Sequence, residues 1–218
     1  FIFFPLHTEM EQYTLVLAPF YTNQLELIRN IARSLPIDYQ LVVKEHPNQY
    51  TRGWRPITEY KEMMSIPNVR LVHPDASSEE IYKKCSLVIS IAGTSSFEAA
   101  FHGKPSIIFT DVMYDSMPSV FRVKSIEELP KIIRNILENH PNPKDVEEMI
   151  KKLESVSFDF NFHEFNSNVS KYFFYDGSNT NVDLSNEQMK KFLSINNDIL
   201  EKITLEHIKR INFYSQKN

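Results

Sequence analysis

The stretch LVISIAGTSSFEAAFHGKPSIIFT, residues 87–110, predicts a strand, a helix and a second strand in quick succession. Residues 87–92 form a short, continuously apolar run, which is typical of a strand buried on both faces. Residues 95–102 have the composition of a short helix and are followed by Gly103, the residue type that most often ends a helix. Residues 105–110 form the second apolar run. Strands joined in this way lie parallel in one sheet, so the stretch predicts an α/β fold.

The same alternation of apolar runs and amphipathic segments extends through the first 140 residues. It predicts a doubly wound, Rossmann-like parallel sheet with helices on both faces. We expect strands at residues 1–6, 40–44, 69–72, 87–92, 105–110 and 122–124. We expect helices at residues 24–35, 58–64, 77–84, 95–102 and 125–139.

The pattern changes after His140, so we divide the chain into a sheet domain, residues 1–140, and a mostly helical, aromatic-rich extension, residues 141–218. Residues 176–179, DGSN, predict a turn within the extension. Its aromatic residues fit two alternatives. They pack on the sheet domain, or they form a surface that meets a further domain.

Bulk properties set limits on function. The chain has 218 residues, 42% of them apolar, and a net charge of −4. Such a charge gives no general attraction for nucleic acid, so an anionic ligand needs a local binding site. The single cysteine, Cys85, favours a reducing compartment. We expect a cytoplasmic protein, either freely soluble or peripheral to the inner face of the membrane. The chain opens with Phe1 inside a predicted strand and without an initiating methionine, which favours a piece of a longer protein.

The expected ligand site follows from the sheet. Ligands of open parallel sheets bind beyond the carboxyl ends of the strands, where the strand order reverses. If the order is 3-2-1-4-5, that point lies between the first and fourth strands. The segments that follow the first, second and fourth strands are PLHTEME (5–11), KEHPNQ (44–49) and AGTSSFEA (92–99). All three are polar and two contain histidine, so we expect them to form one site.

The third segment is suited to a phosphate. Gly93 follows the strand, and small hydroxyl residues, Thr94, Ser95 and Ser96, open the helix. The start of a helix presents backbone N–H groups and a positive dipole end. Glu98, one turn further, is placed to accept hydrogen bonds from ribose hydroxyls. The alternative is that Ser95 and Glu98 form a capping box, which needs no ligand.

The other two segments contribute cationic and imidazole groups. Lys44 ends the second strand, and Pro47 holds His46 in extended geometry, where its ring can donate to a phosphate or sugar oxygen. Arg55 in the next loop can reach a phosphate or carboxylate, and His7 follows the central strand. Each has a structural alternative: a hydrogen bond at the strand end for His46, a solvated charge for Arg55 and plain loop polarity for His7.

Several activities lack their sequence signatures. The chain has only 4 glycines and no Gly-x-Gly-x-x-Gly or Walker A motif, so nicotinamide and P-loop chemistry are not expected. The 7 histidines are scattered without metal-ligand spacing, and there is no Gly-x-Ser-x-Gly motif. We expect neither a metal nor a cofactor.

The three polar segments, in this order, resemble the capsule and surface-polysaccharide glycosyltransferases of the GT-B type. The likeness spans residues 1–139 and is strongest to the family that contains the retaining Kdo transferases of capsule export. The His-Pro and Ser-Ser pairs are also similar to those of bacterial polysialyltransferases and CDP-glycerol polymerases. The resemblance implies that His46, Pro47, Ser95 and Ser96 bind a cytidine nucleotide.

The resemblance further implies that the chain is the donor-binding half of a two-domain enzyme. It would bind a nucleotide sugar, with a CMP-linked Kdo or sialic-acid-like donor expected, and transfer the sugar to a glycan acceptor. The acceptor and the catalytic base would come from an N-terminal GT-B domain, so we assign no catalytic residue. We expect no nucleic acid partner, whereas a membrane-peripheral polysaccharide-assembly complex would fit this role. Two alternatives stay open: a UDP-sugar 2-epimerase-like enzyme, and a non-catalytic nucleotide-binding module in polysaccharide assembly.

Overall fold

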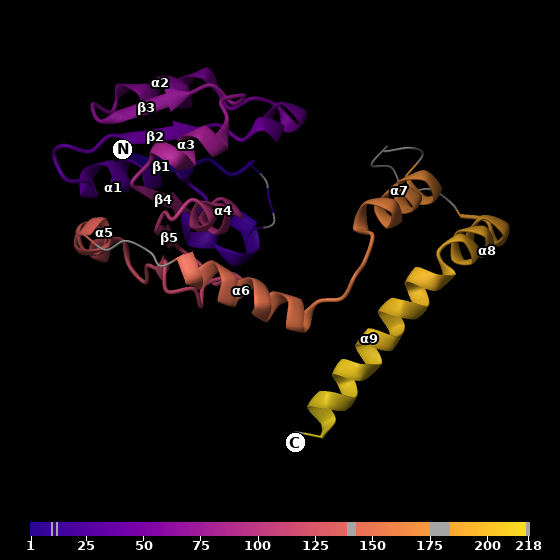
Figure 1. The fold of residues 1–218 in the computed structure, drawn as a ribbon. Coiled ribbons are helices and arrows are strands. Elements are labelled where there is room, and N and C mark those ends of the chain that lie inside the picture. Colours follow the sequence, from indigo (N-terminus) through magenta and orange to yellow (C-terminus); the bar gives the residue numbers. More distant parts are fainter. Residues whose placement is uncertain (10, 12, 139–142, 175–183, 217–218) are drawn as a thin grey trace. The chain divides into compact units, whose positions relative to one another are not determined.

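The computed structural model describes residues 1–9, 11, 13–138, 143–174 and 184–216. It divides into two compact units, Phe1–Lys152 and Leu153–Asn218. The first unit is α/β and the second is helical (Figure 1). The boundary expected after residue 140 and the turn expected at residues 176–179 lie outside the described residues.

The first unit contains six parallel strands in the order β3-β2-β1-β4-β5-β6. Their bounds are β1 (Ile2–Pro5), β2 (Leu41–Lys44), β3 (Val69–Val72), β4 (Leu87–Ser90), β5 (Ser106–Ile108) and β6 (Val120–Arg122). Phe3 of β1 pairs with Val42 on one side and Val88 on the other. The predicted doubly wound sheet is confirmed, and the strand order reverses between β1 and β4.

Helices cover both faces of this sheet (Figure 1). Alternate residues of β1 point to opposite faces, so Phe4 packs in the core cluster shared with α1, α2 and α5, and Phe3 packs with α3 and α4. Both faces are buried, which explains the continuously apolar strands. The helices are α1 (Gln24–Ser34), α2 (Ile57–Ser65), α3 (Ser78–Lys84), α4 (Ser95–Phe101), α5 (Leu129–Glu138) and α6 (Pro143–Val156).

Local sequence signals set several helix ends. The Ser77 hydroxyl accepts a hydrogen bond from the Glu80 amide and begins α3. Gly103 follows α4 with φ +65°, a left-handed conformation that glycine adopts without strain. The helix expected from residue 125 instead begins as the 3-10 turn η4 (Ile126–Glu128), which continues into α5. The described residues also include the π-helical segment η1 (Tyr13–Leu17) and the 3-10 segments η2 (Pro19–Tyr21) and η3 (Pro47–Arg52).

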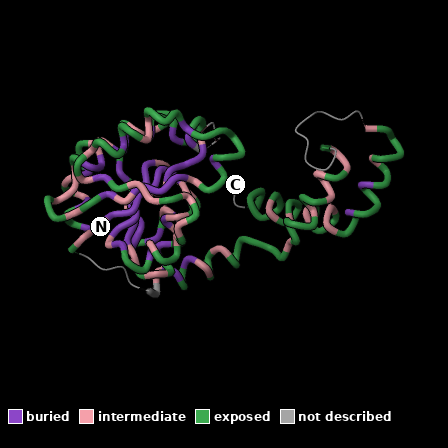
Figure 2. The backbone as a smooth tube through the Cα atoms, turned by 90° about the horizontal axis from the view of Figure 1, so that it is seen from above, coloured by how far each residue is buried: buried purple, intermediate pink, exposed green. Residues whose placement is uncertain are grey.

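The second unit contains α7 (Phe162–Phe173), α8 (Asn186–Ile195) and α9 (Asn197–Ser215). Its buried centre is Phe192, against which the rings of Phe165, Tyr172 and Phe173 pack at centroid distances of 4.8–6.2 Å. These aromatic residues therefore pack within their own unit, a use that neither sequence alternative included. Most other residues of these helices are exposed (Figure 2). Among the described residues, no helix is both long and apolar enough to cross a bilayer.

Candidate functional site

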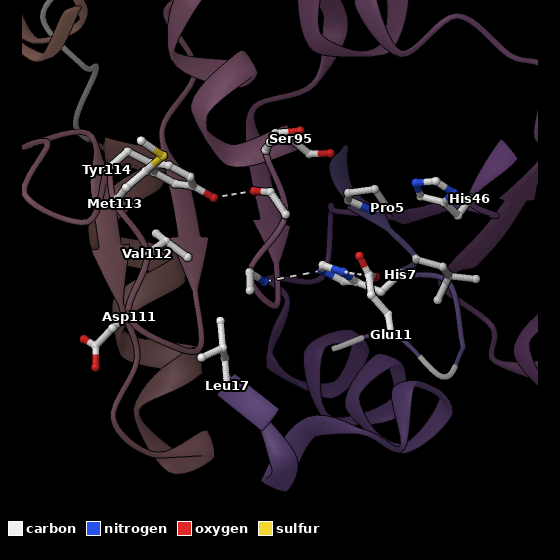
Figure 3. Close-up of a pocket in the computed structure, with 14 residues that line it drawn as sticks. Pro5, His7, Glu11, Leu17, His46, Ser95, Asp111, Val112, Met113 and Tyr114 are labelled. Atoms are coloured by element: carbon white, nitrogen blue, oxygen red, sulfur yellow. Dashed lines mark hydrogen bonds and ion pairs between the residues drawn. The ribbon is translucent and has the colours of Figure 1, made fainter. Parts of the chain in front are cut away.

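A pocket of about 370 Å³ opens at the carboxyl edge of the sheet, between β1 and β4 (Figure 3). Its volume lies in the range of small-molecule sites. We call it the switch-point pocket. It is lined by Pro5, Leu6, His7, Glu11, Leu17, His46, Ala92, Gly93, Thr94, Ser95, Asp111, Val112, Met113 and Tyr114. All three predicted polar segments contribute to this lining, so the structure brings them together as expected.

His7 is held rigidly at the floor of the switch-point pocket. The Gln24 amide accepts from the His7 backbone N–H at 2.8 Å and donates to its carbonyl at 3.1 Å. The His7 ring accepts from the Ala92 N–H through Nε2 at 3.3 Å, which assigns the ring proton to Nδ1. Nδ1 faces Glu11 at 3.2 Å. Both ring nitrogens are thus engaged with the protein.

His46 is half-buried on the opposite side of the pocket from Met113 and Tyr114 (Figure 3). Its Nδ1 accepts a hydrogen bond from the Asn48 N–H at 3.1 Å, so the proton lies on Nε2. Burial lowers the pKa of His46, which favours the neutral ring. The Nε2–H group is then the donor that His46 can offer a ligand.

Gly93 allows close packing at the centre of the site. A Cβ atom at this position would lie 3.3 Å from His7 Cε1, tighter than an ordinary contact. The Gly93 carbonyl accepts a short hydrogen bond from the Tyr114 hydroxyl (Figure 3). A side chain at Gly93 would press against the His7 ring, so it is the space beside this ring, and not the backbone conformation, that favours glycine.

The two serines of the predicted Ser-Ser pair differ in position. Ser95 lines the switch-point pocket, whereas Ser96 is fully buried and its hydroxyl bonds Ser90 at 2.8 Å. The alternative for this segment, a capping box of Ser95 and Glu98, is not formed, because the residue at the helix start is Thr94 and its hydroxyl donates to Glu98 at 2.7 Å. Glu98 also accepts from the Tyr82 hydroxyl and lies outside the pocket lining.

Lys44, Pro47 and Arg55 are also not brought to the pocket lining. Lys44 Nζ donates to the Ser78 hydroxyl at 2.8 Å, and Pro47 begins the exposed turn η3. Arg55 is buried in an ion-pair cluster with Glu9 and Glu45. The structure therefore leaves His7, His46, Gly93, Thr94 and Ser95 as the sequence-predicted residues that line the pocket.

One wall of the pocket was not predicted. Residues 111–114, DVMY, follow β5 and face the segment after β4 (Figure 3). Asp111 forms an ion pair with Arg122, and Met113 is largely exposed at the rim. The rule that selected the other segments considered only the first, second and fourth strands, near the reversal of strand order, so it left out the segment after β5.

The described lining of the pocket does not carry a net positive charge. Besides the Tyr114 phenol, its titratable side chains are two imidazoles, His7 and His46, and two carboxylates, Glu11 and Asp111. Neither lysine nor arginine is among the described residues that line it. A bound anion would therefore be held mainly by neutral hydrogen-bond donors.

Glu11 gives this site a testable pH dependence. The hydrogen bond with His7 holds the pKa of Glu11 below its usual value, although burial opposes the shift. A lowered folded-state pKa stabilises the fold above the unfolded pKa, and this contribution is lost as the pH falls through the folded value. Glu11→Gln should therefore be less stable than the wild type near pH 7. The difference in the free energy of unfolding between the two proteins should become smaller below about pH 4.5. Urea unfolding across pH 3–7 measures this. A difference in unfolding free energy that stays constant with pH would contradict the lowered pKa of Glu11.

The comparisons with known proteins can now be set beside this geometry. Residues 19–120 match the model of one protein family. That family is described as "Capsule polysaccharide biosynthesis protein". This match includes His46 and residues 93–95, but it begins at residue 19 and so does not include His7. A comparison with curated protein sequences gives no match.

Solved structures similar to this chain include glycosyltransferases. Thermosulfurimonas dismutans KpsC, a beta Kdo 2,7 transferase, is 21% identical with a TM-score of 0.46, over 59% of this chain and 42% of that one. Anabaena Alr3699/HepE, solved with UDP-glucose, is 14% identical with a TM-score of 0.43, over 71% and 49%. The spinosyn rhamnosyltransferase SpnG, solved with thymidine diphosphate, is 16% identical with a TM-score of 0.40, over 71% and 40%. The matched region thus spans less than half of each of these proteins.

Proposed function

We propose that this chain is the donor-binding part of a glycosyltransferase of capsule or surface-polysaccharide biosynthesis. The observation that carries the proposal is the switch-point pocket, which joins the segments after β1, β2 and β4 where the strand order reverses. Open α/β sheets bind nucleotides at this place. The capsule-biosynthesis match over residues 19–120 supports the same role.

In this proposal the donor phosphate lies between His46 and the start of α4. Thr94 and Ser95 line the pocket at the point where helical N–H groups have no partner within the helix. The His46 Nε2–H adds a neutral donor from the other side. These groups stabilise the negative charge that develops on the phosphate as the glycosidic bond breaks. The acceptor and the catalytic base come from another part of the enzyme.

The charge of the pocket favours a CMP-linked sugar as the donor. The phosphodiester of a CMP-sugar carries a single negative charge, whereas a nucleoside diphosphate sugar carries a charge on each phosphate. Glu11 and Asp111 line the pocket; Asp111 is paired with Arg122 from outside the lining, and Glu11 is hydrogen-bonded to His7. A second phosphate charge would be repelled by Glu11, so a donor with one phosphate is favoured at this position, and the carboxylate of a Kdo or sialic-acid-like sugar must lie away from Glu11.

Ser95 and Ser96 provide a matched pair of variants. Ser95→Ala removes a hydroxyl at the pocket and should weaken CMP binding by about 3-fold to 10-fold; because this side chain also hydrogen-bonds Tyr82, a loss of about 1 kcal/mol of stability is expected as well. Ser96→Ala leaves the buried Ser90 hydroxyl without its partner and should cost about 1–3 kcal/mol of stability while CMP affinity is kept. Calorimetry and urea unfolding measure the two effects. Equal loss of affinity in both variants would contradict this arrangement.

The proposed function itself is tested by titrating the wild-type chain with CMP, CDP and UDP by calorimetry. We expect CMP to bind and the diphosphates to bind more weakly. No heat with any of the three at millimolar concentration would overturn the proposal. A preference for UDP would overturn the CMP assignment and favour a UDP-sugar enzyme such as a 2-epimerase.

A further inference from the structure

The Arg55 guanidinium is enclosed by the loops that follow β1 and β2. Its side chain is 0% exposed. Nε donates to Glu45 Oε2 at 2.7 Å, Nη2 donates to the His7 carbonyl at 2.6 Å and Nη1 pairs with Glu9. Each of its three nitrogens therefore binds a different residue of the protein.

This arrangement makes Arg55 unsuitable as a phosphate ligand. Its charge is already matched by two carboxylates, Glu9 and Glu45, and its side chain does not line the switch-point pocket. Burial without such partners would be costly for a guanidinium. The planar guanidinium of arginine can donate hydrogen bonds in three fixed directions at once. The single ammonium group of lysine, on a flexible chain, cannot reproduce this geometry.

The contacts of Arg55 lead to both pocket histidines. On one side it holds the carbonyl of His7 directly. On the other side it holds Glu45, whose second oxygen accepts the backbone N–H of His46 at 2.8 Å. Glu45 also accepts from the Tyr60 hydroxyl at 2.8 Å, which fixes the carboxylate in place. One buried guanidinium thus sets the backbone positions of two residues that line the same pocket.

We propose that Arg55 is a positioning residue that holds the His7 and His46 loops in register across the switch-point pocket. It acts on ligand binding through His46 without touching the ligand. This inference rests on the proposed function only for its binding consequence. The structural coupling of the two histidine loops stands apart from any ligand.

The coupling is tested first without ligand, in the Arg55→Lys variant, by NMR of the histidine ring protons. We expect the His7 and His46 signals to shift and the His207 signal, from the second unit, to stay in place. Glu9→Gln is the milder variant, because Glu9 is 39% exposed and its loss removes one ion pair without burying a new charge. It should also shift the His7 signal and leave the His207 signal in place, so the coupling can be tested even if Arg55→Lys does not fold. Unmoved His7 and His46 signals in folded variants would overturn the proposal.

The binding consequence is tested by calorimetry with CMP. Arg55→Lys should weaken binding by roughly 10-fold, because a small displacement of a binding group is costly even when charge is kept. The same substitution in a His46→Ala background should have almost no further effect, because its route to the ligand is already lost. Full additivity of the two substitutions, or retained affinity in Arg55→Lys, would overturn the positioning role. A wild type that binds no CMP would refute the proposed function and leave the ligand-free test intact.

Discussion

Replacing His46 with alanine should weaken CMP binding by about 10-fold to 100-fold. A hydrogen bond from a neutral donor to a charged phosphate contributes about 1.5–3 kcal/mol, and each 1.4 kcal/mol is a factor of about ten in affinity. His46 is half-buried at the pocket, and its Nδ1 is occupied by Asn48, so Nε2–H is the group that is lost. Calorimetric titration of the variant measures the change.

His73→Ala is the matched control for this substitution. His73 also follows a strand of the same sheet, but its side chain is 76% exposed and lies outside the switch-point pocket. We expect CMP affinity to be unchanged in His73→Ala, and both variants to unfold close to the wild-type urea midpoint. Wild-type affinity in His46→Ala, or an equal loss in both variants, would remove His46 from the site.

Phe4→Ala should lower the free energy of unfolding by about 3–5 kcal/mol, the largest change in stability that we predict. Phe4 is 0% exposed in β1, the strand that pairs with both β2 and β4. Removing the ring leaves a cavity in the core. Because β1 is hydrogen-bonded to a strand on each side, the surrounding chain cannot easily move in to fill it. Urea unfolding followed by circular dichroism measures the loss.

Phe20→Ala is the control for this prediction, because Phe20 is 93% exposed. Its free energy of unfolding should stay within about 0.5 kcal/mol of the wild type. A change below 1 kcal/mol in Phe4→Ala would show that β1 is not the centre of the folded core.

The sheet could be predicted because its strands are buried on both faces. The apolar runs at residues 41–43 and 87–92, with amphipathic helices between them, are typical of strands in a parallel sheet that is covered on both faces. The strand order 3-2-1-4-5 was assumed from the fold class; the structure has this order and adds β6 beside β5. Strand and helix ends shifted by one to three residues, because end residues are fixed by tertiary hydrogen bonds that the local sequence does not encode.

The candidate site was less predictable, because side-chain direction depends on distant partners. Arg55 was placed among ligand-binding residues, and only its contacts with Glu9 and Glu45 reveal a buried cluster. Ser95 and Ser96 are identical in type, yet one lines the pocket and the other bonds Ser90 in the core. Successive positions on a helix face different directions, so a Ser-Ser pair cannot present both hydroxyls alike.

The central claim is that the switch-point pocket binds a cytidine nucleotide. The most direct measurement is a titration of the ¹⁵N-labelled chain with CMP, followed by NMR. The account predicts that the backbone amide signals of His46, Gly93, Thr94 and Ser95 shift together with one saturation curve. Shifts confined to a second pocket, at the amino ends of the strands and lined by Lys84 and Lys104, would contradict this claim. Unmoved signals at all of these residues would contradict it equally.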